Sequence, residues 1–218
     1  MTMPARAPFF IGLAGPSCSG KTSIAQQIAA GLPGTATVFG TDSYYLDLSH
    51  LTPAERARQN FDDPGILESA LLAQHLQSLR RGERICQPVY DFSTHSRIQG
   101  REEIIHPSDF LIVEGLFILH WPDVRAMFDL RVFIATEDET CLERRKARDV
   151  RDRGRTVESV VSQYAATVRP GAQHFVLPSK AHADLVVNGH QPIEISAQQI
   201  VNSVRRRLDT PSALHARV

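Results

Sequence analysis

The side chains with the clearest chemical potential lie in one short segment, GPSCSGKT, at residues 15–22. It matches GxxxxGK followed by Thr, a pattern that binds triphosphates because its glycines let backbone N–H groups converge on anionic oxygens. A helix that begins here adds the positive end of its dipole. Lys21 can reach the β- and γ-phosphates, and the Thr22 hydroxyl can ligate Mg²⁺. The segment predicts binding of ATP or GTP. The expected nucleotide contacts are Gly15, Pro16, Ser17, Cys18, Ser19, Gly20, Lys21, Thr22 and Ser23.

Two carboxylates follow apolar segments that are typical of buried strands. Asp42 comes directly after residues 37–40, and Glu114 directly after residues 110–113. In a parallel sheet the carboxyl ends of the strands line the ligand crevice, beside the glycine-rich loop. Asp42 could accept the proton of a hydroxyl group or hold a metal-bound water, and Glu114 suits a magnesium partner. The alternatives are a loop or capping aspartate and a surface glutamate that ends a strand.

A third candidate is a strongly basic segment at residues 144–155. Seven of its residues are Lys or Arg and two are Asp, so it carries a local net charge of +5. Such a cluster suits the charge that develops on a transferring phosphoryl group. A solvated helix face or a nucleic-acid patch would show the same composition.

The segments that must position these residues alternate between strand and helix patterns. Strands are predicted at residues 9–14, 37–40, 110–113, 130–135 and 184–187, and helices begin near residues 21, 67, 137, 156 and 196. Residues 85–90 and 97–105 flank a polar turn and predict a hairpin. The alternation predicts an α/β fold, with a central parallel sheet covered by helices on both faces.

Several helix boundaries follow from local signals. Capping boxes are predicted to open helices at residues 52–55, 136–139 and 196–199, and Pro170 is predicted to end the helix at residues 156–168. No repeat or linker divides the chain, so residues 1–218 are expected to form one domain with a loose tail at about residues 209–218.

Composition narrows the class of protein. The 218 residues are 42% hydrophobic and carry 24 Lys and Arg against 24 Asp and Glu, a net charge of zero. This balance argues against a non-specific partner of nucleic acid or of a membrane surface. Three widely spaced cysteines fit a reducing compartment, and the longest apolar stretch, broken at Glu114, is too short to span a bilayer. The apolar residues 9–14 do not resemble a secretory signal, so the expected location is the cytoplasm.

Several longer motifs resemble one family. The strings GPSCSGKTS, TDSYY, NFDDPGIL, PVYDFSTHSR, FLIVEGLFIL, RDVRDRGRT, VRPGAQHFVLPSK and ADLVVNG occur in this order between about residues 9 and 189. Together they resemble the uridine–cytidine kinases. The resemblance implies a P-loop NTPase fold with a β-hairpin over the nucleoside site and an arginine-rich helical lid. It also implies transfer of the γ-phosphate of ATP, with Mg²⁺, to the 5′-hydroxyl of uridine or cytidine, and a homotetramer.

The same resemblance implies a role for each matching residue. Asp42 is the expected general base, Lys21 the phosphate-binding lysine, and Arg148 and Arg153 the lid. Thr22, Glu114 and Asp42 are the expected magnesium site. The expected nucleoside contacts are Asp62, Arg145, Arg155 and Gln163 for the ribose, and Tyr90, His95, Phe61, Phe92 and Tyr45 around the pyrimidine. This agrees with their chemistry, since a carboxylate can accept from two ribose hydroxyls and aromatic rings can flank a base.

One departure from the family pattern affects the nucleoside pocket, because Asp63-Pro64-Gly65 stands where the family has His-Pro-Asp. Three other functions remain open. One is a kinase for another small alcohol such as nicotinamide riboside, pantothenate or a sugar phosphate, which gives no reason for Tyr90 and His95 at their spacing. The second is a nucleotide-dependent switch, and the third a nucleic-acid binder that uses the basic segment.

Overall fold

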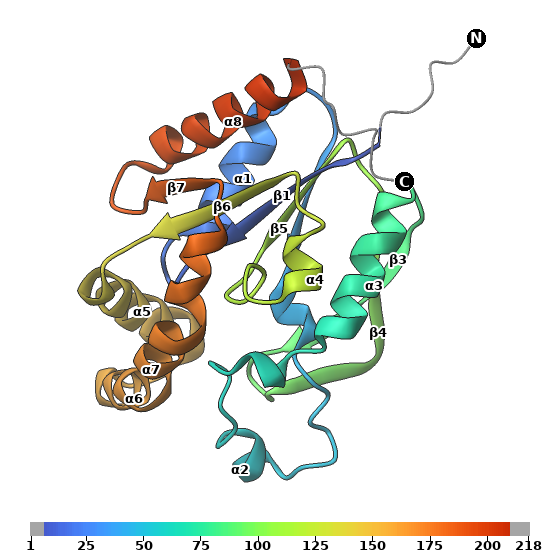
Figure 1. Cartoon of the computed structure of the whole chain (residues 1–218). Helices are drawn as coiled ribbons and strands as arrows, with labels where there is room; N and C mark the ends of the chain where they lie inside the picture. The colour runs from blue at the N-terminus through green and yellow to red at the C-terminus, as the bar shows by residue number, and fades with distance from the viewer. Residues whose placement is uncertain (1–6, 210–218) are drawn as a thin grey trace.

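The structure, a computed structural model, describes residues 7–209 and is built on one five-stranded parallel sheet (Figure 1). Its strands are β1 (Phe9–Ala14), β2 (Ala36–Gly40), β5 (Phe110–Glu114), β6 (Leu130–Ala135) and β7 (Leu185–Asn188). They lie in the order β2-β5-β1-β6-β7, and every pair is parallel. The predicted α/β class is confirmed, because helices cover both faces of this sheet.

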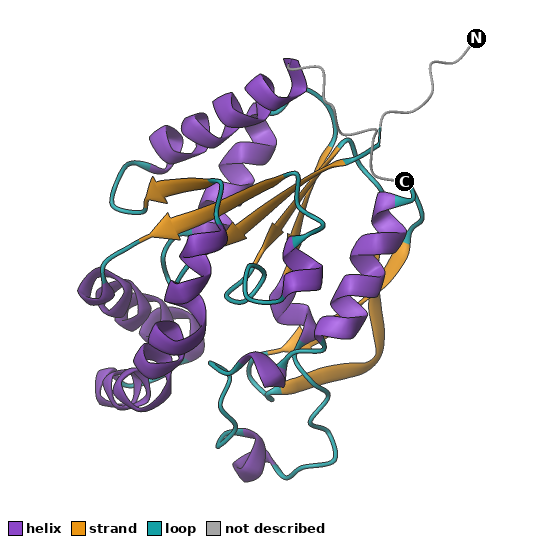
Figure 2. Cartoon of the chain, viewed as in Figure 1, coloured by secondary structure: helices purple, strands orange, loops and turns teal. Residues whose placement is uncertain are grey.

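Register places the ends of three strands at one edge of the sheet. Leu13 and Gly40 both pair with Glu114, so β1, β2 and β5 end side by side. All five arrowheads point to the same side in Figure 2. The segments that follow β1 and β2 therefore begin next to Glu114, as expected for a ligand crevice in a parallel sheet.

Two hydrophobic layers hold the sheet between its helices. On one face, α1 (Lys21–Gly31) and α8 (Ile193–Asp209) pack on residues such as Ile112. On the other face, α3 (Ser69–Arg80) and α4 (Pro122–Arg125) pack on residues such as Leu111. Successive strand residues thus face opposite layers, and each fully buried side chain of this size contributes about 1.5–3 kcal/mol.

A separate two-stranded hairpin, predicted from the sequence, extends beyond the sheet. It consists of β3 (Ile85–Asp91) and β4 (Ser96–Ile105), which pair antiparallel. In the turn between them Asp91 accepts a hydrogen bond from the backbone N–H of Ser93 at 2.8 Å, and His95 adopts a left-handed φ of 51°. The turn therefore fixes the direction of the His95 side chain, because few residues tolerate this conformation.

The basic segment is helical, as predicted, and continues into a longer run of helix. Helix α5 (Asp138–Arg153) ends at Gly154, whose left-handed φ of 60° suits a helix C-terminus. The chain then forms α6 (Val157–Gln163) and α7 (Arg169–Gly171). Figure 1 shows these helices grouped beyond the carboxyl ends of the strands.

The prediction that Pro170 ends its helix is wrong. Pro170 lies inside α7, between two π-helical segments, Tyr164–Val168 and Ala172–Val176, and a 3₁₀ segment, Leu177–His182, follows. The wider π turns change the hydrogen-bond pattern around the proline, which has no N–H to donate, so the chain continues without a break.

Two of the three predicted capping boxes are also wrong. Thr52 does cap the short helix α2 (Pro53–Arg56) together with Glu55. Thr136 instead donates to the Ser19 backbone oxygen at 3.4 Å, and α5 starts after Glu137 with no side-chain cap. Helix α8 begins three residues before Ser196, whose buried hydroxyl donates to the Asn188 backbone oxygen at 3.1 Å. In both cases a tertiary partner takes the hydroxyl that the cap would use.

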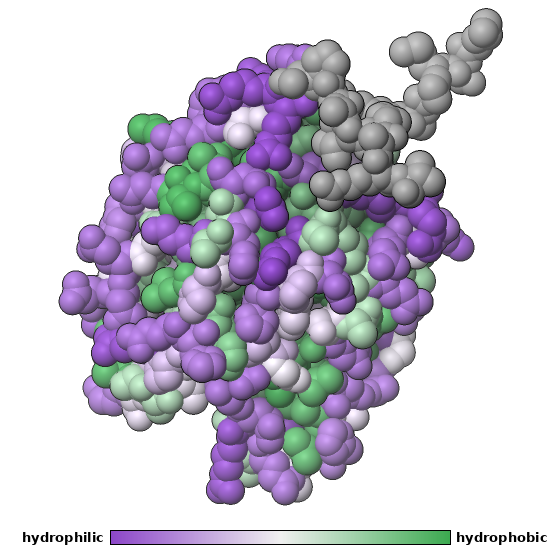
Figure 3. Space-filling view, in the orientation of Figure 1, coloured by the Kyte–Doolittle hydropathy of each residue, from purple (hydrophilic) through white to green (hydrophobic). Residues whose placement is uncertain are grey.

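The face shown in Figure 3 is largely hydrophilic, with apolar areas that are small and separate. Among residues 7–209, no helix is both long and apolar enough to cross a membrane. Of the predicted tail, Asp209 is the last residue of α8, and residues 210–218 lie outside the described part.

Candidate active site

A cavity of about 1300 Å³ lies at the carboxyl ends of the strands. It is lined by the loop after β1, the turn after β2, the β3–β4 hairpin and α5. Every residue predicted for the site lines it except Gly15 and Pro16, which lie at the base of the loop. The fold therefore gathers the predicted nucleotide, metal and nucleoside residues around one space.

In the loop after β1, the lysine side chain contacts backbone oxygens of the loop itself. Lys21 Nζ donates to the backbone oxygens of Gly15, at 3.0 Å, and Pro16, at 2.8 Å. At Gly15 a Cβ atom would lie 2.7 Å from the Ile134 backbone oxygen, so only glycine fits there. The loop also holds Cys18 at a left-handed φ of 63° and runs into the N-terminus of α1. This is the geometry of a phosphate cradle.

Two predicted metal-binding side chains touch each other. The Thr22 hydroxyl donates to Glu114 Oε1 at 2.8 Å. Burial raises the pKa of Glu114, the nearby Lys21 opposes that rise, and Asp42 adds to it. The pair joins the first turn of α1 to the end of β5 and presents two oxygen atoms to the cavity.

Asp42 lies in the 3₁₀ turn Thr41–Tyr44, directly after β2. The Asp42 side chain is exposed to the cavity, but the protein around it replaces part of its hydration and raises its pKa, which Lys21, Arg153 and Arg148 oppose in decreasing order. The turn is attached to α3, because the hydroxyl of buried Tyr44 forms a hydrogen bond with His75 Nδ1 at 2.7 Å. The Asp42 carboxylate thus faces the cavity from a fixed turn, within the field of three cations.

Asp62 forms part of the opposite wall of the cavity. It is 7% exposed, and its Oδ2 accepts a hydrogen bond from the Thr167 hydroxyl at 2.9 Å. Burial raises the pKa of Asp62, while Arg145 and the Thr167 hydrogen bond lower it. The backbone of Gly171 passes so close that a Cβ there would lie 2.4 Å from the Asp62 backbone oxygen. The helical run after α5 thus supports this carboxylate from outside the cavity.

Five aromatic side chains form a connected wall beside Asp62. The rings of Phe61 and His95 stack at 5.0 Å with an angle of 24° between their planes. Tyr45 lies 5.2 Å from Tyr90, which lies 5.3 Å from Phe92 in an edge-to-face arrangement. The Tyr90 hydroxyl is buried and has no hydrogen-bond partner among the described residues. A flat, partly polar ligand fits such a wall, since it offers ring faces and an unused hydroxyl.

His95 is half-buried in this wall. Burial lowers the pKa of His95, and the positive charges of Arg153 and Arg155 lower it further. The imidazole is therefore neutral near pH 7 and offers one hydrogen-bond donor and one acceptor.

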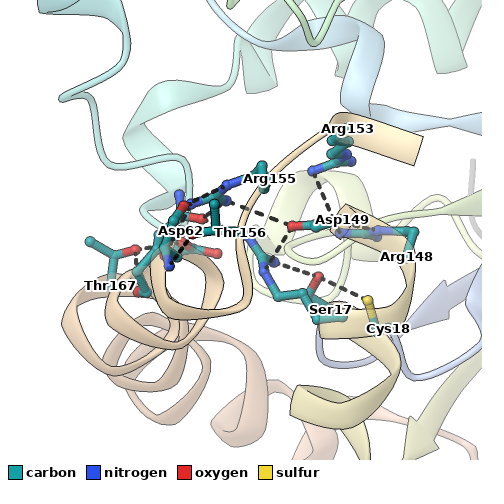
Figure 4. Close-up of polar contacts among 12 residues, drawn as sticks. Ser17, Cys18, Asp62, Arg148, Asp149, Arg153, Arg155, Thr156 and Thr167 are labelled. Carbon is teal, nitrogen blue, oxygen red and sulfur yellow. Dashed lines mark hydrogen bonds and ion pairs between the residues drawn. The ribbon is translucent and has the colours of Figure 1, made fainter. Parts of the chain in front are cut away.

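The arginines of the basic segment contact both ends of the cavity (Figure 4). Arg145 donates to the Ser17 hydroxyl at 3.0 Å and to Gln163 Oε1 at 3.2 Å. Arg155 donates to the same Gln163 oxygen. The guanidinium of Arg153 lies 5.0 Å from the centre of the Phe92 ring, in cation–π geometry. These side chains link the phosphate cradle to the aromatic wall.

Sequence reasoning missed two residues that hold the predicted ones. Thr167 supports Asp62, and no local signal in the sequence relates the two positions. Asp149 has no exposed side-chain surface and contacts several arginines. A signal was present for Asp149, because Cys141, Arg145 and Asp149 recur every four residues and are the buried positions of α5.

Comparison with known proteins gives a consistent set of matches. The family model described as Phosphoribulokinase / Uridine kinase family matches residues 10–196. Among curated proteins, a uridine kinase from Alkaliphilus metalliredigens is 38% identical over 205 residues, which cover 92% of this chain and 98% of that protein. A uridine kinase from Chloroflexus aggregans is 40% identical over 205 residues, which cover 93% of this chain and 97% of that protein.

Solved structures agree at the level of the fold. Phosphoribulokinase from Rhodobacter spheroides superposes with a TM-score of 0.65 at 16% identity, covering 84% of this chain and 71% of that one. D-glycerate 3-kinase from Cryptococcus neoformans superposes with a TM-score of 0.60 at 17% identity, covering 85% and 88%. The sheet and its helices therefore form the P-loop kinase fold that the sequence predicts.

Proposed function

This chain belongs to the phosphoribulokinase/uridine kinase family, and from that premise we propose that it transfers the γ-phosphate of ATP to the 5′-hydroxyl of uridine. Cytidine is the second expected acceptor, and the products are the nucleoside monophosphate and ADP. The matches to the two uridine kinases described above extend over nearly the whole length of those proteins. The reaction salvages a free pyrimidine nucleoside.

The observation that carries this function is the shared cavity. A phosphate cradle, a carboxylate without a strong ion pair and an aromatic wall with a buried carboxylate all line the same space of about 1300 Å³. A donor triphosphate and an acceptor with a flat ring and a sugar can then lie end to end. Such positioning is the main task in phosphoryl transfer.

Magnesium fits the donor end of the cavity. The Thr22 hydroxyl and Glu114 already lie 2.8 Å apart, and Asp42 lies in the adjacent turn. Among residues 7–209, no group of three or more His, Cys, Asp or Glu side chains could hold a metal ion by itself. Mg²⁺ normally takes one or two protein oxygens and completes its shell with phosphate and water, which suits these residues. When bound, the ion neutralises charge on the β- and γ-phosphates.

Asp42 is the proposed general base. It can accept the proton of the acceptor 5′-hydroxyl while Lys21 holds the phosphates in the cradle. Burial favours the neutral carboxyl group, whereas the cations around Asp42 favour the carboxylate that a base requires. Arg148 and Arg153 lie close enough to Asp42 to shift its pKa, so they can also stabilise charge on the phosphoryl group in flight.

The acceptor is proposed to bind between Asp62 and the aromatic wall. Asp62 can accept hydrogen bonds from both ribose hydroxyls, with Arg145, Arg155 and Gln163 bordering the sugar. Recognition of a hydroxyl by a buried carboxylate discriminates strongly against an analogue that lacks it. His95 and Tyr90 are proposed to read the polar edge of the pyrimidine. The rings of Phe61, Phe92 and Tyr45 enclose its apolar surface.

The test is ATP turnover with Mg²⁺ against a panel of acceptors, with the product identified by mass. The panel comprises uridine, cytidine, 2′-deoxyuridine, adenosine, nicotinamide riboside, pantothenate and a blank without acceptor. We expect turnover with uridine and cytidine and a loss of at least about a hundredfold in kcat/KM with the deoxy analogue.

Two results would contradict the proposed activity, and a third would contradict only the proposed role of Asp62. Turnover only with another alcohol would retain the kinase chemistry but reject the pyrimidine pocket. Nucleotide binding with no acceptor-dependent turnover would favour a switch. Equal turnover of uridine and 2′-deoxyuridine would reject the role of Asp62 alone.

A further inference from the structure

One carboxylate of α5 is surrounded by arginines and has no contact with solvent. The Asp149 side chain is 0% exposed, and its Oδ1 lies 2.8 Å from both Nε and Nη2 of Arg148. The same oxygen lies 3.6 Å from Arg153 Nη1. Its Oδ2 lies 3.5 Å from Arg145 Nε and 3.7 Å from Arg155 Nη1. Figure 4 shows Asp149 in the middle of this group.

These contacts differ from those of a saturated buried ion pair. Oδ2 of Asp149 and Nε of Arg145 have no hydrogen-bond partner, although their charges lie within ion-pair distance. Each of the two terminal nitrogens of Arg145 donates elsewhere, Nη1 to Ser17 and Nη2 to Gln163. Asp149 therefore attracts Arg145 without occupying the groups that reach the cavity. Buried charged groups are usually hydrogen-bonded, so the unpaired Oδ2 atom of Asp149 needs a physical explanation.

Helix geometry and one turn bring the cations together. Arg145 precedes Asp149 by one helical turn and Arg153 follows it by one, so both project on the same side of α5. Gly154 then reverses the chain, and the backbone N–H of Arg155 donates to the Asp149 backbone oxygen at 3.2 Å. The turn therefore brings the Arg155 side chain back to the Asp149 carboxylate.

The four arginines point to different parts of the site. Arg145 contacts the phosphate cradle through Ser17. Arg155 contacts Gln163, at the acceptor end. Arg148 and Arg153 lie near the proposed base, because their charges lower the pKa of Asp42. One buried anion thus lies within ion-pair distance of all four of these arginines.

We propose that Asp149 is the positioning residue of the lid arginines Arg145, Arg148, Arg153 and Arg155, a buried anion that holds their guanidinium groups in place along the cavity, from the phosphate cradle to the acceptor end. The proposal rests on the phosphoryl transfer proposed above. Four like charges this close repel one another, and repulsion favours side-chain conformations that spread into solvent. Asp149 removes part of that repulsion and leaves an excess of positive charge for the phosphates. It acts through the arginines and does not line the cavity.

The first test replaces only the charge, with Asp149→Asn. The amide has the same size and shape, so packing is retained while the attraction for the arginines is lost. We expect kcat with uridine to fall at least about tenfold, and KM for uridine and for ATP to change by less than about threefold, because the lost interactions matter most in the transition state. The matched control is Glu143→Gln, which removes an exposed ion pair with Lys146 on the same helix and should leave kcat unchanged.

The second test reads the arginines directly and does not depend on activity. Trypsin cleaves after Arg and Lys, and held guanidinium groups in a stable helix resist cleavage. In the presence of Mg²⁺ and ADP, Asp149→Asn should be cut within residues 144–155 at least about five times faster than the wild-type chain. Cleavage of Asp149→Asn outside this segment should match the wild type. The control Glu143→Gln should retain the thermal midpoint of the wild type. A purely structural role for Asp149 predicts instead that cleavage increases throughout the chain.

A third variant keeps the proposal testable if Asp149→Asn does not fold. At Gly154 an added Cβ meets no atom within 4 Å, so Gly154→Ala strains only the left-handed turn and retains Asp149 and all four arginines. We expect it to lower kcat in the same direction and to increase cleavage in the same segment. Unchanged kcat and cleavage in this variant would then overturn the proposal.

The outcomes separate this inference from the proposed function. If the wild-type chain does not phosphorylate uridine, the function fails, and the trypsin comparison still tests Asp149. If the wild-type chain is active but Asp149→Asn retains kcat within about twofold and is cleaved like the wild type, Asp149 does not position the lid.

Discussion

At the scale of single residues, three carboxylates of the cavity have three different partners. Asp42 lies among cations, Glu114 accepts a hydrogen bond from Thr22, and Asp62 accepts one from Thr167. Burial raises the pKa of all three, so the partners decide what each carboxylate can do. Asp42 has three cations nearby, lines the cavity, and is the one of these three carboxylates that accepts no hydrogen bond from another side chain of the described residues, so it can accept a proton as a general base must.

The proposed base is tested by Asp42→Asn. The amide cannot accept the hydroxyl proton, so kcat should fall by about a hundredfold or more while the affinity for ATP, measured by calorimetry, changes by less than about threefold. Asp123→Asn, at an exposed position of α4, is the matched control. A loss in kcat of less than about tenfold, or about 1.4 kcal/mol of barrier, would reject the assignment.

The protonation state of His95 predicts a pH-dependent choice of acceptor. Neutral imidazole can accept a hydrogen bond from the 4-amino group of cytidine, whereas the protonated ring can only donate, as the 4-oxygen of uridine requires. Since burial and two arginines hold the pKa of His95 below 6.5, the KM ratio of cytidine to uridine should be constant above pH 6.5. The ratio should rise as the pH falls through the lowered pKa. In His95→Gln it should not depend on pH.

The lowered pKa of His95 also affects the stability of the folded chain. The unfolded chain, with an ordinary histidine pKa of 6.5, takes up this proton at a higher pH than the folded chain does. His95 therefore makes the free energy of unfolding smaller as the pH falls below 6.5, and it has no such effect at higher pH. The difference in thermal midpoint between the wild-type chain and His95→Gln should therefore be constant above pH 6.5 and should change as the pH falls below it.

Single residues differ in how well the sequence predicts them. Asp42 and Glu114 follow strands, so the rule that ligands bind at the carboxyl ends of a parallel sheet places both side chains near the phosphate cradle. Thr167 lies far along the chain from Asp62, and their hydrogen bond depends on how a whole helical run packs. Asp149 was counted as a charge that offsets the arginines, because composition does not distinguish a buried anion from an exposed one.

At the scale of elements, the helical run after α5 forms the outer wall of the acceptor end. Its backbone at Gly171 touches the backbone of Asp62, and its Thr167 hydroxyl holds the Asp62 carboxylate. Thr167 lies in a π-helical segment, and Gly171 lies in α7 between two such segments, whose wider turns shift the phase of the helix and so change the direction of the side chains beyond them. This run therefore determines where the proposed ribose contact lies.

Gly171→Ala tests that contact. The added methyl group would lie 2.4 Å from the Asp62 backbone oxygen, so the segment around Asp62 must move. We expect KM for uridine to rise by about tenfold, with overpacking costing about 1–3 kcal/mol, while the affinity for ADP is unchanged. Ala165→Ser, at an exposed position of the same run, serves as the control. An unchanged KM in a folded Gly171→Ala variant would show that Asp62 does not bind the acceptor.

Elements were predicted well where local pattern and tertiary environment agree. The strand β1 has the predicted bounds, because a short apolar run between polar loops is buried on both sides of the sheet. The predictions failed at helix ends, where Thr136 and Ser196 use their hydroxyls on distant backbone oxygens. At Pro170, packing of the following residues into the core outweighed the loss of one backbone hydrogen bond.

At the scale of the whole molecule, the two hydrophobic layers share a single sheet. Strands β1, β2, β5 and β6 each contribute side chains to both layers, so neither layer can form without the other. We propose on this ground that the described chain unfolds as one cooperative unit, as the sequence predicts from the lack of linkers.

Thermal unfolding tests this cooperativity and the shared site together. We expect one transition by calorimetry and by far-ultraviolet circular dichroism. ADP with Mg²⁺, and uridine, at about 100 times their dissociation constants should each add about 2.7 kcal/mol when bound alone, which for a chain of this size shifts the midpoint by about 5–10 °C. Two separate transitions, only one of which responds to ligand, would contradict a single unit.

The position of β1 in the centre of the sheet has a consequence for synthesis on the ribosome. Phe9 pairs with Phe110, and Ile11 pairs with Leu130, so both neighbours of β1 are made long after β1 itself. At about 5–20 residues per second, roughly 5–20 s pass before the first of these strands emerges. During that time the apolar segment FFIGLA has no neighbouring strands to bury it. The strand that leads into the phosphate cradle therefore stays exposed until β5 and β6 are made, and a chaperone that binds apolar segments would protect it during that time.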